Sequence, residues 1–393
     1  MIKPIYILAA KRTPLGSFMG TLSTLSAPKL GSIAIEAALK EAGIKPDAVE
    51  EVYMGCVLAA GIGQAPARQA AIFSGIPKST PCTTVNKVCG SGMKAVMLGA
   101  QAIETGQADL VVAGGMENMS QVPHYLENAR GGYRMGHQKI VDGMIKDGLW
   151  DPYHDFHMGN AAELCAREMK FSREEQDQFS IQSFKRAQEA TKSGRFKNEI
   201  AAVSIQQKKG DPVLVDTDEG PSKAQFDKIP KLNPVFQKDG TVTAANASTI
   251  NDGAAALVLA SEEYVKRTGA KPIAKLVAYA QHAQAPEWFT TAPVEASRKV
   301  LKRSGWEMSS VDLVEVNEAF AVVALAAQRE LGIPSEKLNV HGGAVSLGHP
   351  IGASGARILV TLTHALASLG KRRGLASICI GGGEATAVTL ERV

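Results

Sequence analysis

Residues 89–95 read Cys89-Gly90-Ser91-Gly92-Met93-Lys94-Ala95 and place one thiol on a turn rich in glycine. The β-branched residues of 83–88 favour a strand before the turn, and residues 93–105 favour a helix after it. A thiol at a helix N-terminus lies near unpaired N–H groups and the positive end of the helix dipole. We therefore expect the pKa of Cys89 to lie below its usual value of about 8.5.

Two other interpretations of this turn stay open. A cysteine without further context is most often a small buried core residue. Residues 90–95 also match G-x-G-x-x-A, a dinucleotide-binding turn, and Asp109 follows at about the distance of a ribose-binding acid. Asp109 stands before the apolar run 110–113, however, whereas a ribose-binding acid should follow such a strand. The dinucleotide interpretation is therefore the weaker one.

The composition excludes several classes of protein. A chain of 393 residues with 45% hydrophobic residues and 38 glycines fits a large α/β enzyme of two or three domains. The net charge of +4, without a dense Lys/Arg run, argues against nucleic-acid binding. No apolar run reaches the ~18 residues of a membrane span. Five cysteines without a C-x-x-C pair, and no signal-peptide pattern, predict a reduced compartment, and we expect a cytoplasmic protein.

The chain repeats one series of landmarks. Four segments of the first part match four of the last part in the same order: 49–55 with 311–317, 75–78 with 332–335, 91–94 with 354–357, and 110–117 with 378–384. This repetition predicts two copies of one α/β unit. If the copies pack face to face about a pseudo-twofold axis, their equivalent turns meet, and Cys89 of the first copy meets His349 of the second.

The repetition also predicts the domain boundaries. We expect an N-terminal unit of residues 1–120 and 248–270, an inserted loop domain of residues 121–247, and a C-terminal unit of residues 271–393. The inserted part is richer in charged residues and contains a helical stretch at 172–192. Its first basic residues suit either a solvated surface or a phosphate-bearing ligand: Arg130, Arg134, Lys139 and Lys146.

Three further residues stand at turns or strand ends. His349 precedes Pro350, which favours an extended backbone, and an imidazole there can take a proton from Cys89. Cys379 precedes the glycine run 381–383, whose N–H groups can line an anion site. Asn317 closes a strand and opens a helix. Taken singly, these residues are more simply interpreted as a hydrogen-bonded structural histidine, a core cysteine and a helix N-cap.

Four blocks together resemble the motifs of the thiolase family. They are Cys89-Gly90-Ser91-Gly92, Asn317-Glu318-Ala319-Phe320, the stretch 342–357 around Gly348-His349-Pro350, and Cys379-Ile380-Gly381-Gly382-Gly383. The resemblance extends from Arg12-Thr13-Pro14 to the C-terminus. It implies a five-layered αβαβα fold, an inserted loop domain that binds coenzyme A, and a homotetramer built as a dimer of dimers.

The resemblance also implies a role for each motif residue. Cys89 is the expected nucleophile that carries the acyl group, His349 the base that activates it, and Cys379 the acid and base at the α-carbon of the acetyl unit. Asn317 is expected to hold a water that forms one oxyanion hole with His349. The amides of Cys89 and Gly381 are expected to form the other. Claisen chemistry needs such donors for an enolate and a tetrahedral oxyanion, and it needs no metal.

Further segments resemble short-chain members of the family. Residues 155–159 and 246–248 resemble segments beside pantetheine, and 287–293 resembles the loop of the mitochondrial acetoacetyl-CoA thiolases. The implied coenzyme A contacts are Leu149, His157, Met158, Lys223, Ser248 and Phe289. The potassium-binding subfamily has a tyrosine after an Asp-Glu pair, whereas Gly220 follows Asp218-Glu219 in this chain. The resemblance therefore leaves potassium binding open.

These observations favour an acetyl-CoA C-acetyltransferase that joins two acetyl-CoA into acetoacetyl-CoA and coenzyme A, reversibly, through acetyl-Cys89. The expected partners are acyl-CoA substrates, with no tightly bound cofactor, no nucleic acid and no membrane. A broad-range 3-ketoacyl-CoA thiolase of fatty-acid breakdown is the alternative, against which the His157-Met158 pair argues. A non-catalytic acyl-CoA binder with the same fold is a second alternative.

Overall fold

The computed structural model describes residues 4–393, so the first three residues of the expected N-terminal unit lie outside it. Its largest sheet has ten strands in the order β14-β15-β16-β13-β1-β12-β5-β3-β4, with the short β2 beside β12. The strands of the first half are β1 (Ile5–Arg12), β2 (Gly16–Ser17), β3 (Glu51–Gly55), β4 (Cys82–Val85), β5 (Leu110–Asn118) and β12 (Asn251–Ser261). Those of the second half are β13 (Ala274–Ala283), β14 (Leu313–Val316), β15 (Arg373–Ile380) and β16 (Glu384–Arg392).

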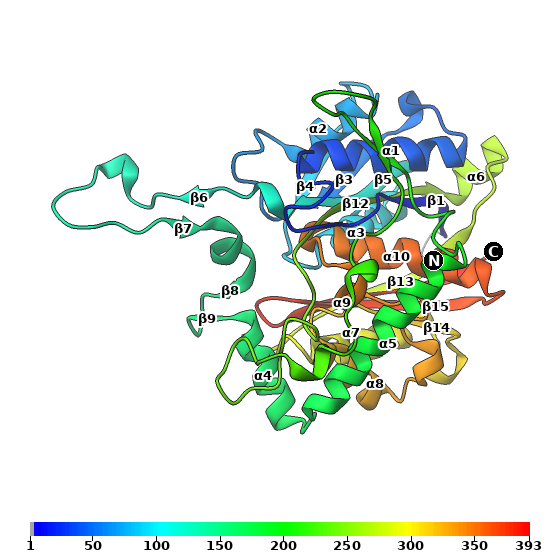
Figure 1. The fold of residues 1–393 in the computed structure, drawn as a ribbon. Helices are drawn as coiled ribbons and strands as arrows, with labels where there is room; N and C mark the ends of the chain where they lie inside the picture. Colours follow the sequence, from blue (N-terminus) through cyan, green and yellow to red (C-terminus); the bar gives the residue numbers. More distant parts are fainter. Residues whose placement is uncertain (1–3) are drawn as a thin grey trace.

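Helices cover both outer faces and fill the space between the two halves (Figure 1). On the first half lie α1 (Ala27–Ala42) and α2 (Pro66–Phe73), and on the second lie α7 (Ala292–Ser304) and α8 (Ala321–Leu331). Between the halves lie α3 (Ser91–Glu104) and α10 (Ile351–Ser368), and α10 contacts strands of both. The five-layered αβαβα arrangement is confirmed. The two sheet layers join where Ile5 of β1 pairs with Leu276 of β13.

The two halves repeat one strand topology. β3 runs parallel to β4 and β5, and β5 runs antiparallel to β12. In the second half β14 runs parallel to β15, and β15 runs antiparallel to β16. Leu338 forms a parallel bridge with Val314, at the place where Cys82 pairs with Val52 in the first half. The duplication expected from the sequence landmarks is therefore present in the strand order itself.

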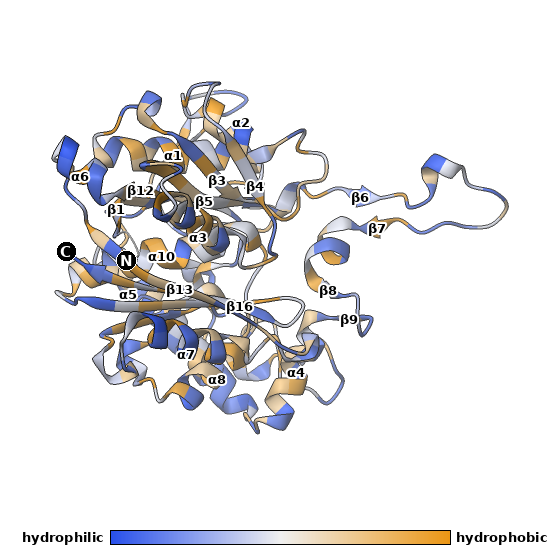
Figure 2. Ribbon diagram, turned by 180° about the vertical axis from the view of Figure 1, so that it is seen from behind, coloured by the Kyte–Doolittle hydropathy of each residue, from blue (hydrophilic) through white to orange (hydrophobic). Residues whose placement is uncertain are grey.

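The central layer is apolar on all sides. Most of α10 is buried around its whole circumference, as expected for a helix enclosed by two sheets. β5 and β12 are buried along their full length, which agrees with their continuous apolar runs. Figure 2 shows the apolar colouring concentrated on these central elements and the polar colouring on peripheral ones such as α6 (Glu262–Thr268).

Residues 119–250 form a long excursion between β5 and β12, which lie side by side in the sheet. It contains α4 (Met158–Glu168), α5 (Arg173–Lys192) and three two-stranded pairs: β6 (His124–Tyr125) with β7 (Val141–Asp142), β8 (Trp150–Asp151) with β9 (Phe156–His157), and β10 (Val203–Ile205) with β11 (Val213–Val215). The β6–β7 arm projects away from the body (Figure 1). Our domain boundaries stay a prediction. No helix within residues 4–393 is long and apolar enough to cross a membrane.

Candidate functional site

The turn that carries Cys89 is held in an unusual backbone conformation. The strand ends at Val85 and the helix begins at Ser91, so the turn is longer than the sequence predicts. Val88 has a φ of +45°, which a β-branched residue rarely adopts and which indicates local strain. The hydroxyl of Ser91 maintains the turn, because it accepts from the Lys87 amide at 2.8 Å and donates to the Val88 carbonyl at 2.6 Å. The residues on both sides of Cys89 therefore hold its backbone in place.

His349 lies between the short helix α9 (Ala344–Leu347) and α10, and its side chain is almost fully buried. Its Nδ1 lies 2.7 Å from the Ser354 hydroxyl, which donates its own hydrogen to the Pro350 carbonyl at 3.0 Å. In this arrangement the Ser354 hydroxyl is free to accept from Nδ1–H, which favours the tautomer with its hydrogen on Nδ1. Nε2 finds no hydrogen-bond partner among the described residues. The structure thus leaves His349 one free lone pair, as a general base requires.

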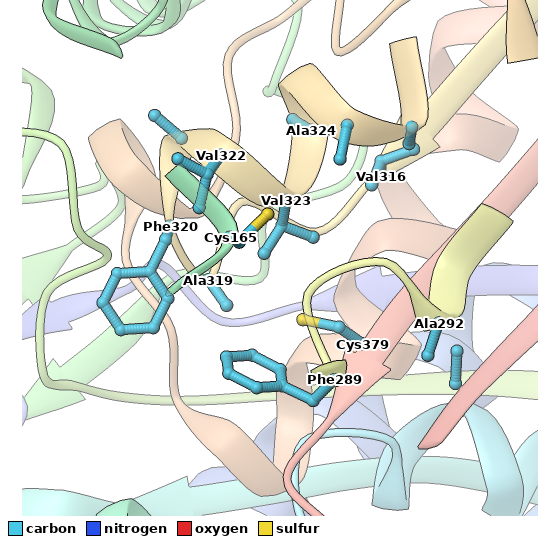
Figure 3. Close-up of a cluster of buried hydrophobic side chains, with 14 of the residues drawn as sticks. Cys165, Phe289, Ala292, Val316, Ala319, Phe320, Val322, Val323, Ala324 and Cys379 are labelled. Atoms are coloured by element: carbon cyan, nitrogen blue, oxygen red, sulfur yellow. The ribbon is translucent and has the colours of Figure 1, made fainter. Parts of the chain in front are cut away.

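Asn317 and Cys379 lie behind these two groups and are fully buried. Asn317 follows β14, and its Nδ2 lies 3.5 Å from Nδ1 of His349. Its Oδ1 has no partner within the described part of the chain. Figure 3 shows the sulfur of Cys379 near Phe289, in one cluster of buried side chains. Cys379 also lies near enough to Cys89 for a charge on one thiol to raise the pKa of the other.

The expected low pKa of Cys89 is wrong for this site. Burial raises the pKa of the Cys89 thiol to about 12, although the N–H groups of Gly381 and of Cys89 itself lower it. Desolvation of a thiolate at the base of the cavity therefore outweighs the effect of the helix terminus. Burial and the charge of Arg357 lower the pKa of His349 to about 3. Both shifts favour the uncharged form of each group at neutral pH.

One cavity of about 520 Å³ collects most of the predicted site residues. Its lining includes Cys89, His349, Gly381, Leu149, His157, Met158, Lys223, Ser248 and Phe289. Asn317 and Cys379 are absent from its surface and lie behind it. Phe236, which we did not single out from the sequence, and Phe320, the last residue of the Asn317 motif block, complete the aromatic wall. The His157 ring stacks on Phe236 at 4.8 Å between centroids. Phe236 lies in a segment without helix or strand, so only a weak sequence pattern could have identified it as a site residue.

A second cavity, of about 460 Å³, adjoins the first and shares Ser17, Lys223 and Thr249 with it. The ammonium of Lys223 donates to Glu219 at 2.7 Å and to the Ser17 hydroxyl at 2.9 Å. The neighbouring Asp218 binds the buried guanidinium of Arg12 through both carboxylate oxygens. The Asp-Glu pair is therefore occupied by basic side chains, and the described residues contain no His/Cys/Asp/Glu group suited to a metal ion.

A buried carboxylate that the sequence did not indicate links the two halves. Glu117, at the end of β5, accepts from the amides of Val57, Leu58 and Gly352 at 2.9 to 3.1 Å. Gly352 belongs to the first turn of α10, so the carboxylate also faces the positive end of that helix. Burial raises the pKa of Glu117 to about 7. Glu117 thus ties the Cys89 half to the helix that follows His349.

Fold and site together define a duplicated α/β protein whose equivalent loops meet at one cavity with a thiol and an imidazole. The family models named "Thiolase, N-terminal domain" and "Thiolase, C-terminal domain" match residues 5–263 and 270–392. The chain belongs to the thiolase family.

Relatives and one solved structure match over nearly the whole length. The chain is 55% identical to acetyl-CoA acetyltransferase 1 of Arabidopsis thaliana, over 99% of this chain and 94% of that protein. It is 52% identical to acetyl-CoA acetyltransferase of Chromobacterium violaceum, over 99% of both. The crystal structure of Acat5 thiolase from Ascaris suum in complex with coenzyme A matches with a TM-score of 0.95 and 46% identity, over the full length of both chains.

Proposed function

We propose that this protein is an acetyl-CoA C-acetyltransferase, which joins two acetyl-CoA into acetoacetyl-CoA and coenzyme A and catalyses the reverse thiolysis. The observation that carries the proposal is that Cys89 and His349 line one cavity, with Nε2 of His349 free of hydrogen-bond partners among the described residues. The names of the full-length relatives support the choice of acetyl-CoA as substrate.

The first half-reaction transfers an acetyl group to Cys89. The sulfur of Cys89 attacks the thioester carbon while its proton passes to Nε2 of His349. The amides of Cys89 and Gly381 stabilise the developing oxyanion, in agreement with their effect on the thiolate. Coenzyme A leaves as a thiolate and takes the proton of Cys379. The products are acetyl-Cys89, a Cys379 thiolate and an imidazolium.

The second half-reaction forms the carbon–carbon bond. The Cys379 thiolate removes a proton from the α-carbon of a second acetyl-CoA, and burial suits it to this task because it raises the pKa of Cys379. A water held by Asn317, together with His349, stabilises the enolate oxygen. The enolate attacks acetyl-Cys89, and the departing Cys89 sulfur recovers its proton from the imidazolium. Cys89, His349 and Cys379 thereby return to the protonation states in which the reaction began.

The two adjoining cavities share Ser17, Lys223, Ala244 and Thr249, and we propose that together they hold coenzyme A. Ser248 and Leu149 line the cavity that contains Cys89, where the pantetheine arm is expected, and Lys223 lines both cavities. Phe289 and Met158 line the same cavity as Cys89, and we expect these side chains to restrict the acyl group to short chains. Steady-state thiolysis of acetoacetyl-CoA and its 2-methyl analogue, with and without potassium, tests this proposal. Faster turnover of a C16 than of a C4 ketoacyl-CoA would instead favour the fatty-acid-breakdown enzyme.

We further propose a cytoplasmic homotetramer. The projecting β6–β7 arm carries exposed apolar side chains, including Leu126, Met135 and Ile140. Such side chains on an extended arm suit contact with another subunit. Light scattering of the purified protein tests the proposal, and a monomer mass at micromolar concentration would contradict it.

A further inference from the structure

The residue after Asn317 is a fully buried glutamate whose carboxylate joins separate parts of the chain. Glu318 accepts from Nδ2 of Asn339 at 2.8 Å, from the Ser183 hydroxyl at 2.7 Å and from the Val345 amide at 3.1 Å. All three partners donate, so a carboxylate, which only accepts, matches them. Burial raises the pKa of Glu318, and the hydrogen bonds from Asn339, Ser183 and Val345 oppose that rise because they stabilise the carboxylate.

Each partner comes from a different segment near the site. Ser183 lies on α5 of the long excursion, and Asn339 lies in the turn that follows α8. Val345 lies in α9, which leads directly to His349. The backbone at Gly343 approaches the carboxylate so closely that an added Cβ would collide with it. Glu318 therefore connects the Asn317 turn to the segment that carries His349.

The other flank of Asn317 is fixed by the same network. Asn339 has a left-handed φ of +45°, and its side chain accepts from the Val316 amide and donates to the Val316 carbonyl, both at 2.9 Å. Asparagine adopts this conformation more readily than other non-glycine residues, and the two hydrogen bonds to Val316 hold it there. Both neighbours of Asn317 are thus held by Asn339, directly at Val316 and through the carboxylate at Glu318.

We propose that Glu318 is a positioning residue for acetyl transfer, which sets Asn317 and His349 at the separation that one oxyanion requires. Asn317 and His349 come from different loops, and their side chains meet only across 3.5 Å. Glu318 is the group that hydrogen-bonds the first loop to the helix preceding the second. The inference rests on the proposed function, because it assigns Glu318 to that reaction.

The variant Glu318→Gln tests the proposal, because it keeps the side-chain size but turns one acceptor into an N–H₂ group that faces donors. We expect kcat for acetoacetyl-CoA thiolysis to fall on the order of 100-fold, with KM for coenzyme A changed less than about threefold. Glu163→Gln is the matched control. Glu163 is also buried and accepts from the amides of Thr241 and Val242, but neither Asn317 nor His349 is near its carboxylate in the hydrogen-bond network.

The control separates positioning from stability. We expect Glu163→Gln to lower the melting temperature as much as Glu318→Gln does, and to keep kcat within about threefold. If Glu318→Gln does not fold, Ser183→Ala removes one of the three donors and is expected to lower kcat about tenfold without changing KM. A folded Glu318→Gln or Ser183→Ala protein with wild-type kcat would overturn the inference. Wild-type protein without thiolysis would instead overturn the proposed function.

Discussion

The two copies of the α/β unit differ most at the turns where they meet. In the first copy the turn is short, and Ser91 bonds only to the backbone that presents Cys89. In the second copy α9 is inserted, and the matching Ser354 bonds to the ring of His349 itself. The matching serines therefore have different roles. Ser91 holds the backbone that presents Cys89, and Ser354 favours one tautomer of the His349 ring.

The helices that follow these turns remain closely equivalent. An added Cβ at Gly92 of α3 would lie 2.8 Å from the Ala356 amide nitrogen of α10, and one at Gly355 would lie 2.5 Å from that of Met93. Each glycine thus allows close approach of the other helix. The comparison teaches that the two copies share the contact between α3 and α10, whereas the turns that precede these helices supply different chemical groups, a thiol and an imidazole.

The first way to break the comparison is to remove the group that only the second copy supplies. We expect His349→Ala to lower kcat for thiolysis on the order of 10³-fold to 10⁴-fold, because Cys89 keeps its proton without a base. Steady-state kinetics measure the loss, and circular dichroism checks the fold. A decrease in kcat of less than tenfold would show that the groups of the first copy are sufficient for thiolysis.

The second way to break the comparison is to disturb the close contact between α3 and α10. Gly355→Ala is expected to destabilise the protein by about 3 kcal/mol, because the added methyl group meets backbone atoms that cannot move aside. Urea denaturation measures the change. Gly131→Ala is the control, since its added Cβ meets no atom, and it should be neutral. Equal stability of the two variants would mean that the helices do not pack this closely.

The third test removes the serine hydroxyl that contacts the His349 ring. Ser354→Ala removes the acceptor for Nδ1–H, so the ring can turn or adopt the wrong tautomer, and kcat should fall on the order of 10-fold to 100-fold. Steady-state kinetics at saturating coenzyme A measure it. Stability should change little, which distinguishes this role from that of a scaffold residue. Wild-type kcat would assign Ser354 to the helix alone.

The smallest expected effect is a change in pH dependence. Burial lowers the pKa of His349 first, and the charge of Arg357 lowers it further. Arg357→Met removes that charge and raises the pKa of His349. A base works only above its pKa, so the acid limb of kcat/KM should move to higher pH, by about one unit. The exposed Arg298→Met is the control. An unchanged or lower acid limb would contradict this account.

The sequence predicted the parts of the molecule that local patterns encode. The glycine turn at Cys89 and the duplication follow from short motifs and their order, and the αβαβα architecture follows from the resemblance to the thiolase family. The strain at Val88, the carboxylates of Glu117 and Glu318 and the ring contact of Ser354 did not, because they depend on contacts between distant segments. The predicted pKa of Cys89 was wrong for a related reason. The helix terminus that lowers this pKa can be recognised in the sequence, whereas the burial that raises it cannot.

The central claim is that the acyl group is carried by Cys89 of the first copy. Labelled acetyl-CoA, followed by peptide mass spectrometry of the acetylated protein, tests it most directly. We predict one acetyl group on the peptide that contains Cys89 in the wild-type protein and none in Cys89→Ala. A covalent acetyl adduct that persists in Cys89→Ala would contradict the account.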